Sequence, residues 1–252
     1  MFQVDLNCDI GEGFGAYSVA DDETILNYIT TANVACGWHA GDPMIMDNVV
    51  RLAKEKGVAV GAHPSYPDLM GFGRRQMKLS PDEIKNYVKY QLGALMAFTR
   101  SYHVPLVHVD LHGALGNLSQ HDREAARAVC EAVRDVDKQI TIQYCVGTVI
   151  IEIAQEMGLK TKTEILADRA YMDDLSLAPR CMEGAVITDE DFVIARCVHV
   201  IKEGKVTGLS GKEMDIQADS LCVHGDSPQA LKLLQKIHDV FREESIQIKC
   251  MY

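Results

Sequence analysis

Short runs of apolar and β-branched residues alternate along the chain with longer segments of helical periodicity. Seven such runs are candidate strands, and several are apolar almost throughout, as is typical of parallel strands that are covered on both faces. They lie at residues 3–8, 31–36, 58–63, 106–111, 140–145, 161–167 and 220–224. The helical segments between them predict right-handed β-α-β crossovers, and hence an α/β fold whose parallel sheet is either open or closed into a barrel.

Two of the intervening helices have clear start signals. Asp42 before a proline is a typical N-cap, and Gly57 is a typical end for the same helix. Ser80, with Glu83 three residues later, reads as a capping box, and apolar residues then recur at helical spacing. Residues 168–187 have no regular pattern, so we expect a long loop there.

Composition narrows the class of protein. The chain has 252 residues, which fits a single β/α barrel domain over residues 1–252, because such barrels commonly reach about 200–250 residues. Its formal net charge of −11 disfavours general binding to nucleic acid or to an anionic membrane. No apolar run is long enough to span a bilayer, and the eight cysteines form no CxxC pair, so we expect reduced thiols in a cytoplasmic protein.

Polar side chains gather at the carboxyl ends of the predicted strands, where parallel α/β folds build their active sites. Five of the nine histidines fall at this edge, which is the strongest indication of a functional site in the sequence. The set comprises Asp5, Asn7, Asp9, Glu12, His39, Asp42, His63, His108, Asp110, His112, Glu164, Asp168, Arg169, His224 and Asp226.

Asp5, Asn7 and Asp9 alternate along the first strand and therefore lie on one of its faces. If that face points into a barrel, the carboxylates need a cation, a shared proton or hydrogen-bond donors, because unpaired buried charges are costly. They are candidate metal ligands or general bases, and the alternative is a strand end near solvent. His63, at the end of a buried strand, is a further candidate base or ligand.

Residues 39–43 and 224–228 each place a histidine, a glycine and then a proline at a predicted helix start. An imidazole beside the positive end of a helix suits an anionic ligand, so His39 and His224 are candidate substrate-binding residues; an ordinary turn is the alternative. Arg74 and Arg75 lie in a glycine-rich segment that we interpret as a mobile loop able to hold a carboxylate or phosphate. A solvated charged loop is the alternative there.

Six segments resemble the signatures of one family closely, at residues 5–15, 33–43, 61–68, 71–75, 167–171 and 221–226. The family is that of the lactam-utilisation (LamB/YcsF) proteins, the A subunits of the prokaryotic ATP-dependent 5-oxoprolinase, and the resemblance covers essentially the whole chain. It implies an irregular seven-stranded β/α barrel related to deacetylase and glycoside hydrolase barrels. It also implies cleavage of 5-oxoproline to L-glutamate, coupled to ATP hydrolysis, together with B and C subunits that activate the lactam by phosphorylation.

Opening a lactam requires a base for water, stabilisation of developing charge and a proton donor for nitrogen. Our catalytic candidates are Asp9, Glu12, His63 and His112. Our candidate substrate ligands are Asn7, His39, Arg74, Arg75, Asp168, Arg169 and His224. A divalent metal is also possible, since carboxylate and imidazole suit zinc or manganese, and its candidate ligands are Asp5, Asp9, His63 and His112.

The sequence has no P-loop, and its glycine-rich run at residues 11–15 is not followed at once by a helix. We therefore expect partner subunits to supply or complete the ATP site, and this chain to be inactive alone. Two alternatives stay open: a metal-dependent deacetylase or amidohydrolase that acts without ATP, and a non-catalytic subunit that binds the lactam. The sequence also leaves open whether the chain forms a homo-oligomer.

One segment departs from the family pattern. Where the family usually has Val-Lys-Pro-His-Gly-Ala-Leu-Tyr-Asn, residues 109–117 read Val-Asp-Leu-His-Gly-Ala-Leu-Gly-Asn. Asp110 thus replaces a lysine, Leu111 a proline and Gly116 a tyrosine, while the histidine is kept as His112. If the lysine holds a phosphate or carboxylate in the family, this chain lacks that contact.

Overall fold

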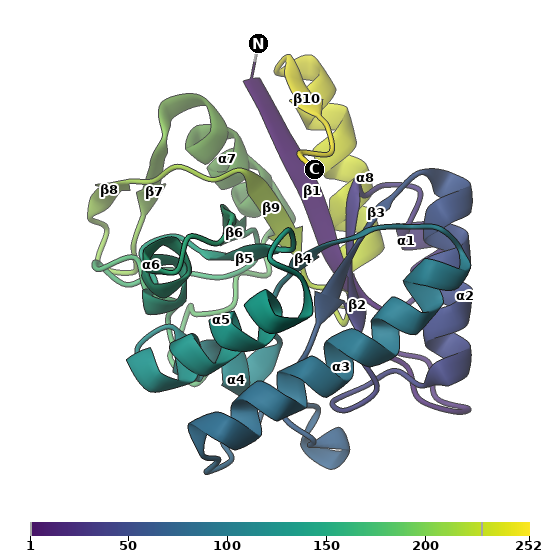
Figure 1. Cartoon of the computed structure of the whole chain (residues 1–252). Helices are drawn as coiled ribbons and strands as arrows, with labels where there is room; N and C mark the ends of the chain where they lie inside the picture. The colour runs from purple at the N-terminus through teal and green to yellow at the C-terminus, as the bar shows by residue number, and fades with distance from the viewer. Residues whose placement is uncertain (1, 228) are drawn as a thin grey trace.

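The computed structural model of the chain describes residues 2–227 and 229–252. Seven parallel strands form a closed barrel in which β9 pairs with β1 to complete the ring (Figure 1). In ring order they are β1 Phe2–Ile10, β2 Thr31–Ala35, β3 Ala59–His63, β4 Leu106–Val109, β5 Thr141–Cys145, β6 Thr161–Leu166 and β9 Ser220–Val223. All seven predicted strands are confirmed, and the sheet is closed rather than open.

Helices cover the outside of the barrel (Figure 1). They are α1 Asp22–Ile25, α2 Pro43–Lys56, α3 Pro81–Ser101, α4 Gly113–Ser119, α5 Arg123–Asp137, α6 Val149–Glu156, α7 Glu190–Glu203 and α8 Ala230–Glu243. The predicted caps are confirmed, because Asp42 accepts hydrogen bonds from two amides of the first turn of α2, and Ser80 forms the capping box with Glu83. Among the described residues, no helix is both long and apolar enough to cross a membrane.

Three short strands were not predicted. β10 Ile246–Ile248 pairs with the first residues of β1, outside the ring. β7 Lys205–Thr207 and β8 Glu213–Asp215 form an antiparallel hairpin. Segments of three residues are too short to produce a periodic pattern, so their strand character depends on tertiary pairing.

The expected loop at residues 168–187 is confirmed, because within it the structure has turns and isolated bridges such as Tyr171 with Leu177. A short 3-10 turn, η1 Leu69–Gly71, follows β3. Pro228, which belongs to the second histidine-glycine-proline segment, lies outside the described residues, and α8 begins two positions later at Ala230.

Alternation along the strands separates an apolar outer shell from a polar barrel interior. In β1, Leu6 and Cys8 belong to the hydrophobic core shared with the helices. Asn7, between them, reaches across the interior to side chains of β2, β6 and β9. The same alternation therefore both stabilises the barrel and carries polar groups to its carboxyl edge.

Candidate active site

A cavity of about 490 Å³ opens at the carboxyl end of the barrel strands. Side chains from β1, β3, β5, β6 and β9 and from the loops that follow the strands contribute to it. Its polar lining includes Asp9, His63, Arg74, Asp110, His112, Asn117, Gln120, His121, Glu164, Arg169, Arg180 and His224. Seven of the fifteen polar residues expected at this edge thus meet around one cavity.

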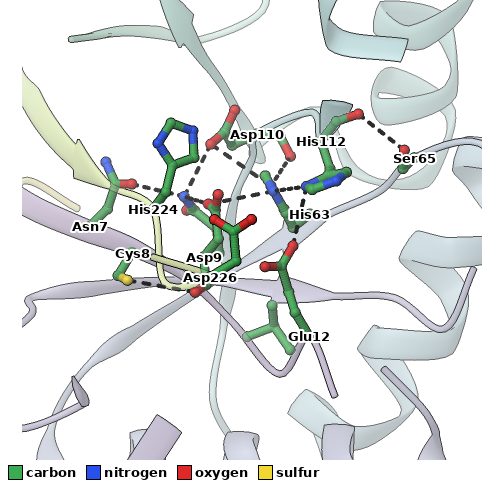
Figure 2. A network of polar contacts seen from close by, with 12 residues as sticks. Asn7, Cys8, Asp9, Glu12, His63, Ser65, Asp110, His112, His224 and Asp226 are labelled. Carbon is green, nitrogen blue, oxygen red and sulfur yellow. Dashed lines mark hydrogen bonds and ion pairs between the residues drawn. The ribbon is translucent and has the colours of Figure 1, made fainter. Parts of the chain in front are cut away.

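His63, the last residue of β3, is 3% exposed, and its two ring nitrogens have different partners. Nδ1 lies 2.9 Å from the backbone oxygen of Asp110, and since a carbonyl oxygen only accepts, Nδ1 carries a proton. Nε2 faces Oδ1 of Asp9 at 3.4 Å and Nδ1 of His112 at 3.1 Å (Figure 2). His63 therefore joins the first strand to the loop after β4.

His112 repeats this arrangement. Its Nε2 lies 2.8 Å from the backbone oxygen of Phe72 and so carries a proton, which leaves Nδ1 facing both His63 and Oε1 of Glu12 at 3.2 Å. In each ring the proton is on the nitrogen that donates to the backbone, so Nε2 of His63 and Nδ1 of His112 carry none. These two nitrogens lie close to each other and to the carboxylates of Asp9 and Glu12. Such a group of buried acceptors needs an added proton or a cation among its members.

Glu12 holds a second imidazole, since Nε2 of His39 lies 3.0 Å from Oε1. Burial, assisted by the nearby charge of His112, lowers the pKa of His39 to about 3, so the neutral ring donates from Nε2. Burial opposes ionisation of Glu12, but the hydrogen bonds from His112 and His39 hold the pKa of this carboxyl well below its usual range. Glu12 is consequently a buried, ionised carboxylate.

Asp9 and His63 form a charged pair. Burial opposes ionisation of Asp9, yet the charge and hydrogen bond of His63 keep the pKa of Asp9 below its ordinary value. Burial likewise opposes the charged form of His63, but Asp9 more than offsets this and raises the pKa of His63 to about 10. Without a cation nearby, the pair is a carboxylate beside an imidazolium.

The donor set of this region fits a divalent cation. Glu12, His39, His63 and His112 each offer a ligand atom, and these atoms lie within 4.8 Å of one another. Carboxylate and imidazole suit Zn²⁺ or Mn²⁺, and the backbone hydrogen bonds of two of these rings are of the kind that orient metal-binding histidines. We call these four residues the Glu12 cluster.

The Glu12 cluster shares only His63 and His112 with the predicted ligand set. Asp9 belongs to a neighbouring acidic group with Asp110 and Cys222. Asp5 lies deeper in the barrel and accepts hydrogen bonds from Thr30, Thr31 and Ser220. Four residues of strand correspond to about 13 Å, so Asp5 and Asp9 share a face but occupy different layers.

Asn33, in the middle of β2, connects several of these groups, although the sequence analysis did not single it out. Its Nδ2 lies 2.8 Å from Oδ1 of Asn7 and 3.0 Å from both Oδ1 of Asp9 and Oδ2 of Asp110. Its Oδ1 accepts from Nε2 of His108 at 2.7 Å. The alternation of polar and apolar residues in β2 directs Asn33 into the barrel. Its hydrogen-bond partners, however, depend on how the neighbouring strands are aligned.

Glu164 of β6 is a third acidic group on the cavity wall. It accepts from Nδ2 of Asn7 at 3.2 Å and from Nε2 of Gln143 at 3.1 Å. Burial, followed by the charge of Asp9, raises the pKa of Glu164 to about 7. Gln143 in turn accepts from the hydroxyl of Tyr252, so a polar chain runs from the opposite end of the barrel to the cavity.

The two adjacent arginines of the predicted loop have separate surroundings. Arg74 lines the cavity and donates to Asp226 across its rim at 2.5 Å. Arg75 does not contribute to the cavity lining; its side chain is 67% exposed and pairs with the buried carboxylate of Asp68. Only the first guanidinium is therefore positioned to meet a ligand in the cavity.

The remaining predicted substrate ligands are also engaged by neighbours. Arg169 is buried on the cavity wall and donates to the backbone oxygens of Ala178 and Ala185. Nδ1 of His224 lies 2.7 Å from Oδ1 of Asp168. Burial disfavours the charged form of His224, but Asp168 outweighs this and raises the pKa of the imidazole.

The segment at 109–117 reaches the cavity wall. Asp110 and Leu111 line the cavity, and burial followed by the charge of Glu164 raises the pKa of Asp110 well above its usual range. A Cβ added at Gly116 would lie 2.3 Å from the hydroxyl oxygen of Tyr144. Tyr144 thus fills the space beside Gly116, and it too lines the cavity.

Comparison with known proteins gives one consistent result. The family model for the LamB/YcsF family matches residues 4–252. The A subunit of 5-oxoprolinase from Campylobacter jejuni subsp. doylei is 50% identical over 248 residues, covering 98% of this chain and 97% of that protein. A protein of the same name from Thermococcus onnurineus is 51% identical over 246 residues, covering 98% of this chain and 96% of that protein.

Solved structures agree with this result. The lactam utilization protein of Thermus thermophilus is similar with a TM-score of 0.93 and 42% identity, covering 98% of this chain and 99% of that one. A GH18 chitinase of Pseudoalteromonas aurantia has a TM-score of 0.53 at 8% identity, covering 93% of this chain and 99% of that one, which is a likeness of fold alone. The predicted relation to glycoside hydrolase barrels is confirmed at that level.

Proposed function

This chain belongs to the LamB/YcsF family, and we propose on that basis that it is the A subunit of an ATP-dependent 5-oxoprolinase, in which it binds the lactam and carries out the hydrolytic step. The names of its relatives support the substrate class. The observation that carries the proposal is the buried pair of Asp9 and His63 on the wall of the cavity. The pair combines an ionised carboxylate, which can act as a base, with an imidazolium that can stabilise negative charge.

Asp9 would act as the base. Its carboxylate takes a proton from water while the water oxygen attacks the carbonyl carbon of the lactam. His63, protonated at both nitrogens, stabilises the negative charge that develops on the substrate. When the carbon–nitrogen bond of the phosphorylated ring breaks, the ring nitrogen receives a proton from this pair and the carbonyl carbon is left as an acyl phosphate. A second water then cleaves the acyl phosphate, so that the ring-opened product is glutamate and the leaving group is inorganic phosphate.

The Glu12 cluster supports a second source of positive charge. A divalent cation held by Glu12, His39, His63 and His112 would replace the proton on Nε2 of His63, and it would polarise a substrate oxygen or lower the pKa of water when bound. Asp9 lies outside this cluster, so its carboxylate stays available as the base.

The substrate ligands divide into two groups. Arg74, Arg169 and His224 line the cavity and are suited to the anionic groups of the substrate. The other four predicted ligands lie outside the cavity lining and contact neighbouring side chains instead. Asn7 holds Glu164, His39 holds Glu12, Arg75 holds Asp68, and Asp168 holds His224.

We propose that the B and C subunits supply the nucleotide site and activate the lactam by phosphorylation in the cytoplasm. The absence of a P-loop from the sequence supports this division of labour. An activated lactam would be hydrolysed by bulk water, so it must pass directly to the cavity. The partner surface would then include the rim near Arg74.

The test is reconstitution with the B and C subunits from the same genome, with glutamate and ADP release measured together. The complex should release both products, and the chain alone should release neither. His63→Gln should lower turnover at least about 100-fold. His199→Gln is the matched control, because His199 is a half-buried residue far from the cavity lining that pairs with Glu213.

Other outcomes would identify a different function. Deacetylation of acetylated sugars without ATP would favour a metal-dependent deacetylase. Binding of 5-oxoproline without turnover, in the presence of active partners, would favour a non-catalytic lactam carrier. ATP-dependent turnover by the purified chain alone would contradict the proposed role of the partners.

A further inference from the structure

We propose that Asp110 accepts the ring N–H of the lactam, which is present in the unactivated ring and forms again when water adds to the phosphorylated ring, and thereby determines which ring the site selects. This inference rests on the proposed function. Asp110 is 3% exposed, follows β4 directly and lines the cavity. Its position on the wall is therefore built into the barrel rather than set by a mobile loop.

The first argument is a count of hydrogen-bond donors. Nδ2 of Asn33 has two hydrogens, yet three oxygens lie within 3.0 Å of it, from Asn7, Asp9 and Asp110. At least one of these oxygens therefore receives no hydrogen from Asn33. Asn7 has the shortest contact, and Asp9 has the charge of His63 beside it. The Asp110 carboxyl also receives a hydrogen bond from the backbone N–H of Leu111, so what it still lacks is a side-chain or ligand donor.

The second argument concerns charge. Among the described residues, no lysine or arginine lies within ion-pair distance of Asp110, and the closest cationic group is Nδ1 of His63 at 3.9 Å. That nitrogen already donates to the backbone oxygen of Asp110. The second carboxyl oxygen, Oδ1, has no side-chain donor in the described part of the chain. An acceptor site on the cavity wall is thus left for a ligand.

A lactam ring nitrogen offers the group that is missing. It is a neutral N–H donor, so it can satisfy the carboxylate without bringing another charge into the cavity. The carboxylate of the same ligand needs cationic donors. Arg74, Arg169 and Arg180 also line the cavity and can supply them. The lining therefore favours a small molecule that carries both an N–H donor and an anionic group.

Two ligands that differ only at the ring atom test this assignment. In 5-oxoproline the ring atom is N–H, and in 5-oxotetrahydrofuran-2-carboxylate it is an oxygen that can only accept. Affinities are measured by calorimetry with the chain alone and with the reconstituted complex. The wild type should bind the lactam at least about 10-fold more tightly than the lactone, because a ring oxygen cannot donate to the Asp110 carboxyl and leaves that buried oxygen without a partner.

Asp110→Asn should bring this ratio close to one, because an amide can rotate to donate to the lactone oxygen. Asp82→Asn, on the exposed first turn of α3, is the matched control and should keep the wild-type ratio. Circular dichroism should confirm that each variant is folded.

Each other outcome has a definite meaning. Equal binding of both ligands by the wild type would overturn the role of Asp110 and leave the lactam substrate in place. A ratio that survives in Asp110→Asn would assign the N–H to another acceptor. If neither ligand binds to the chain or to the complex, the proposed substrate is wrong, and the role of Asp110 falls with it.

Discussion

The imidazole rings of His39 and His112 lie face to face, with centroids 3.9 Å apart and planes 6° apart, and both rings approach Oε1 of Glu12. Two stacked rings on one carboxylate do not both carry a charge, and the low pKa of His39 reflects this. Glu12 and these two rings are therefore arranged for one added proton or, in its place, a divalent cation.

The first prediction concerns cation content. Protein loaded with Zn²⁺ or Mn²⁺ and then dialysed should retain about one ion per chain, because four donor atoms lie within 4.8 Å of one another. Glu12→Gln or His112→Gln should reduce the retained metal to less than half, as measured by plasma mass spectrometry. The His199→Gln variant, whose side chain lies outside the Glu12 cluster, should match the wild type. Dialysed wild-type protein that holds no metal would show that the cluster carries a proton instead.

The second prediction concerns stability and pH. The pKa of Glu164 is about 7 in the folded protein against 4.5 as its ordinary value, so protonated Glu164 favours the folded state. This contribution is complete below pH 4.5 and is lost as the pH rises through 7. Glu164→Gln should therefore gain stability relative to the wild type between about pH 5 and pH 8, by up to about 3 kcal/mol.

Urea unfolding at both pH values measures this difference. Glu55→Gln, on the exposed face of α2, is the control and should follow the wild type at each pH. A stability difference between Glu164→Gln and the wild type that does not change with pH would mean that Glu164 ionises freely in the folded protein.

The third prediction concerns the close approach of a ring to the backbone. A Cβ at Gly61 would lie 2.0 Å from Cε1 of His108, so Gly61→Ala must displace the ring that donates to Asn33. We expect a loss of about 3 kcal/mol in the free energy of unfolding. Gly93→Ala, on the exposed side of α3 with no neighbour within 4 Å, should gain about 0.5–1 kcal/mol. Thermal and urea unfolding compare the two variants, and equal effects would contradict the packing described for His108.

The fourth prediction separates the neighbouring arginines. In the reconstituted complex, Arg74→Ala should raise the KM about 10-fold, because Arg74 lines the cavity. Arg75→Ala should leave the KM within about threefold and instead increase protease cleavage near residue 70, because Asp68 loses its partner. Equal increases in KM would show that the loop acts on the substrate as one unit.

The barrel strands were predictable from sequence because both faces of a parallel strand are buried, which leaves long apolar runs and regular polar interruptions. The capping signals at Asp42 and Ser80 were equally readable, since each involves residues three positions apart. β10 was not predictable, because three residues form a strand only through pairing with Phe2–Val4. Strands and caps that depend on neighbouring residues could thus be predicted, and strands that depend on pairing with a distant segment could not.

The candidate site was only partly predictable for the same reason. Alternation placed Asp5 and Asp9 on one face, but it did not separate their layers. Adjacent arginines are equivalent in a sequence pattern, and the turn at η1 decides that Arg74 faces the cavity and Arg75 faces Asp68. The connections of Asn33 depend on the register of β1, β2 and β4, which no local signal specifies.

The closure of the ring by β1 and β9 also has a consequence for synthesis. Nδ2 of Asn7 and Oγ of Ser220 are 2.7 Å apart but 213 positions distant in sequence. Because β1 pairs with β9, the ring can close only after residue 223 has been synthesised. Dehydration of Asp9 and Glu164 then accompanies a single late event, in which contacts of very high sequence separation form together. The buried charges of the candidate site therefore oppose the final step of folding, and a chain shortened before β9 would have most of the strands without the closed cavity.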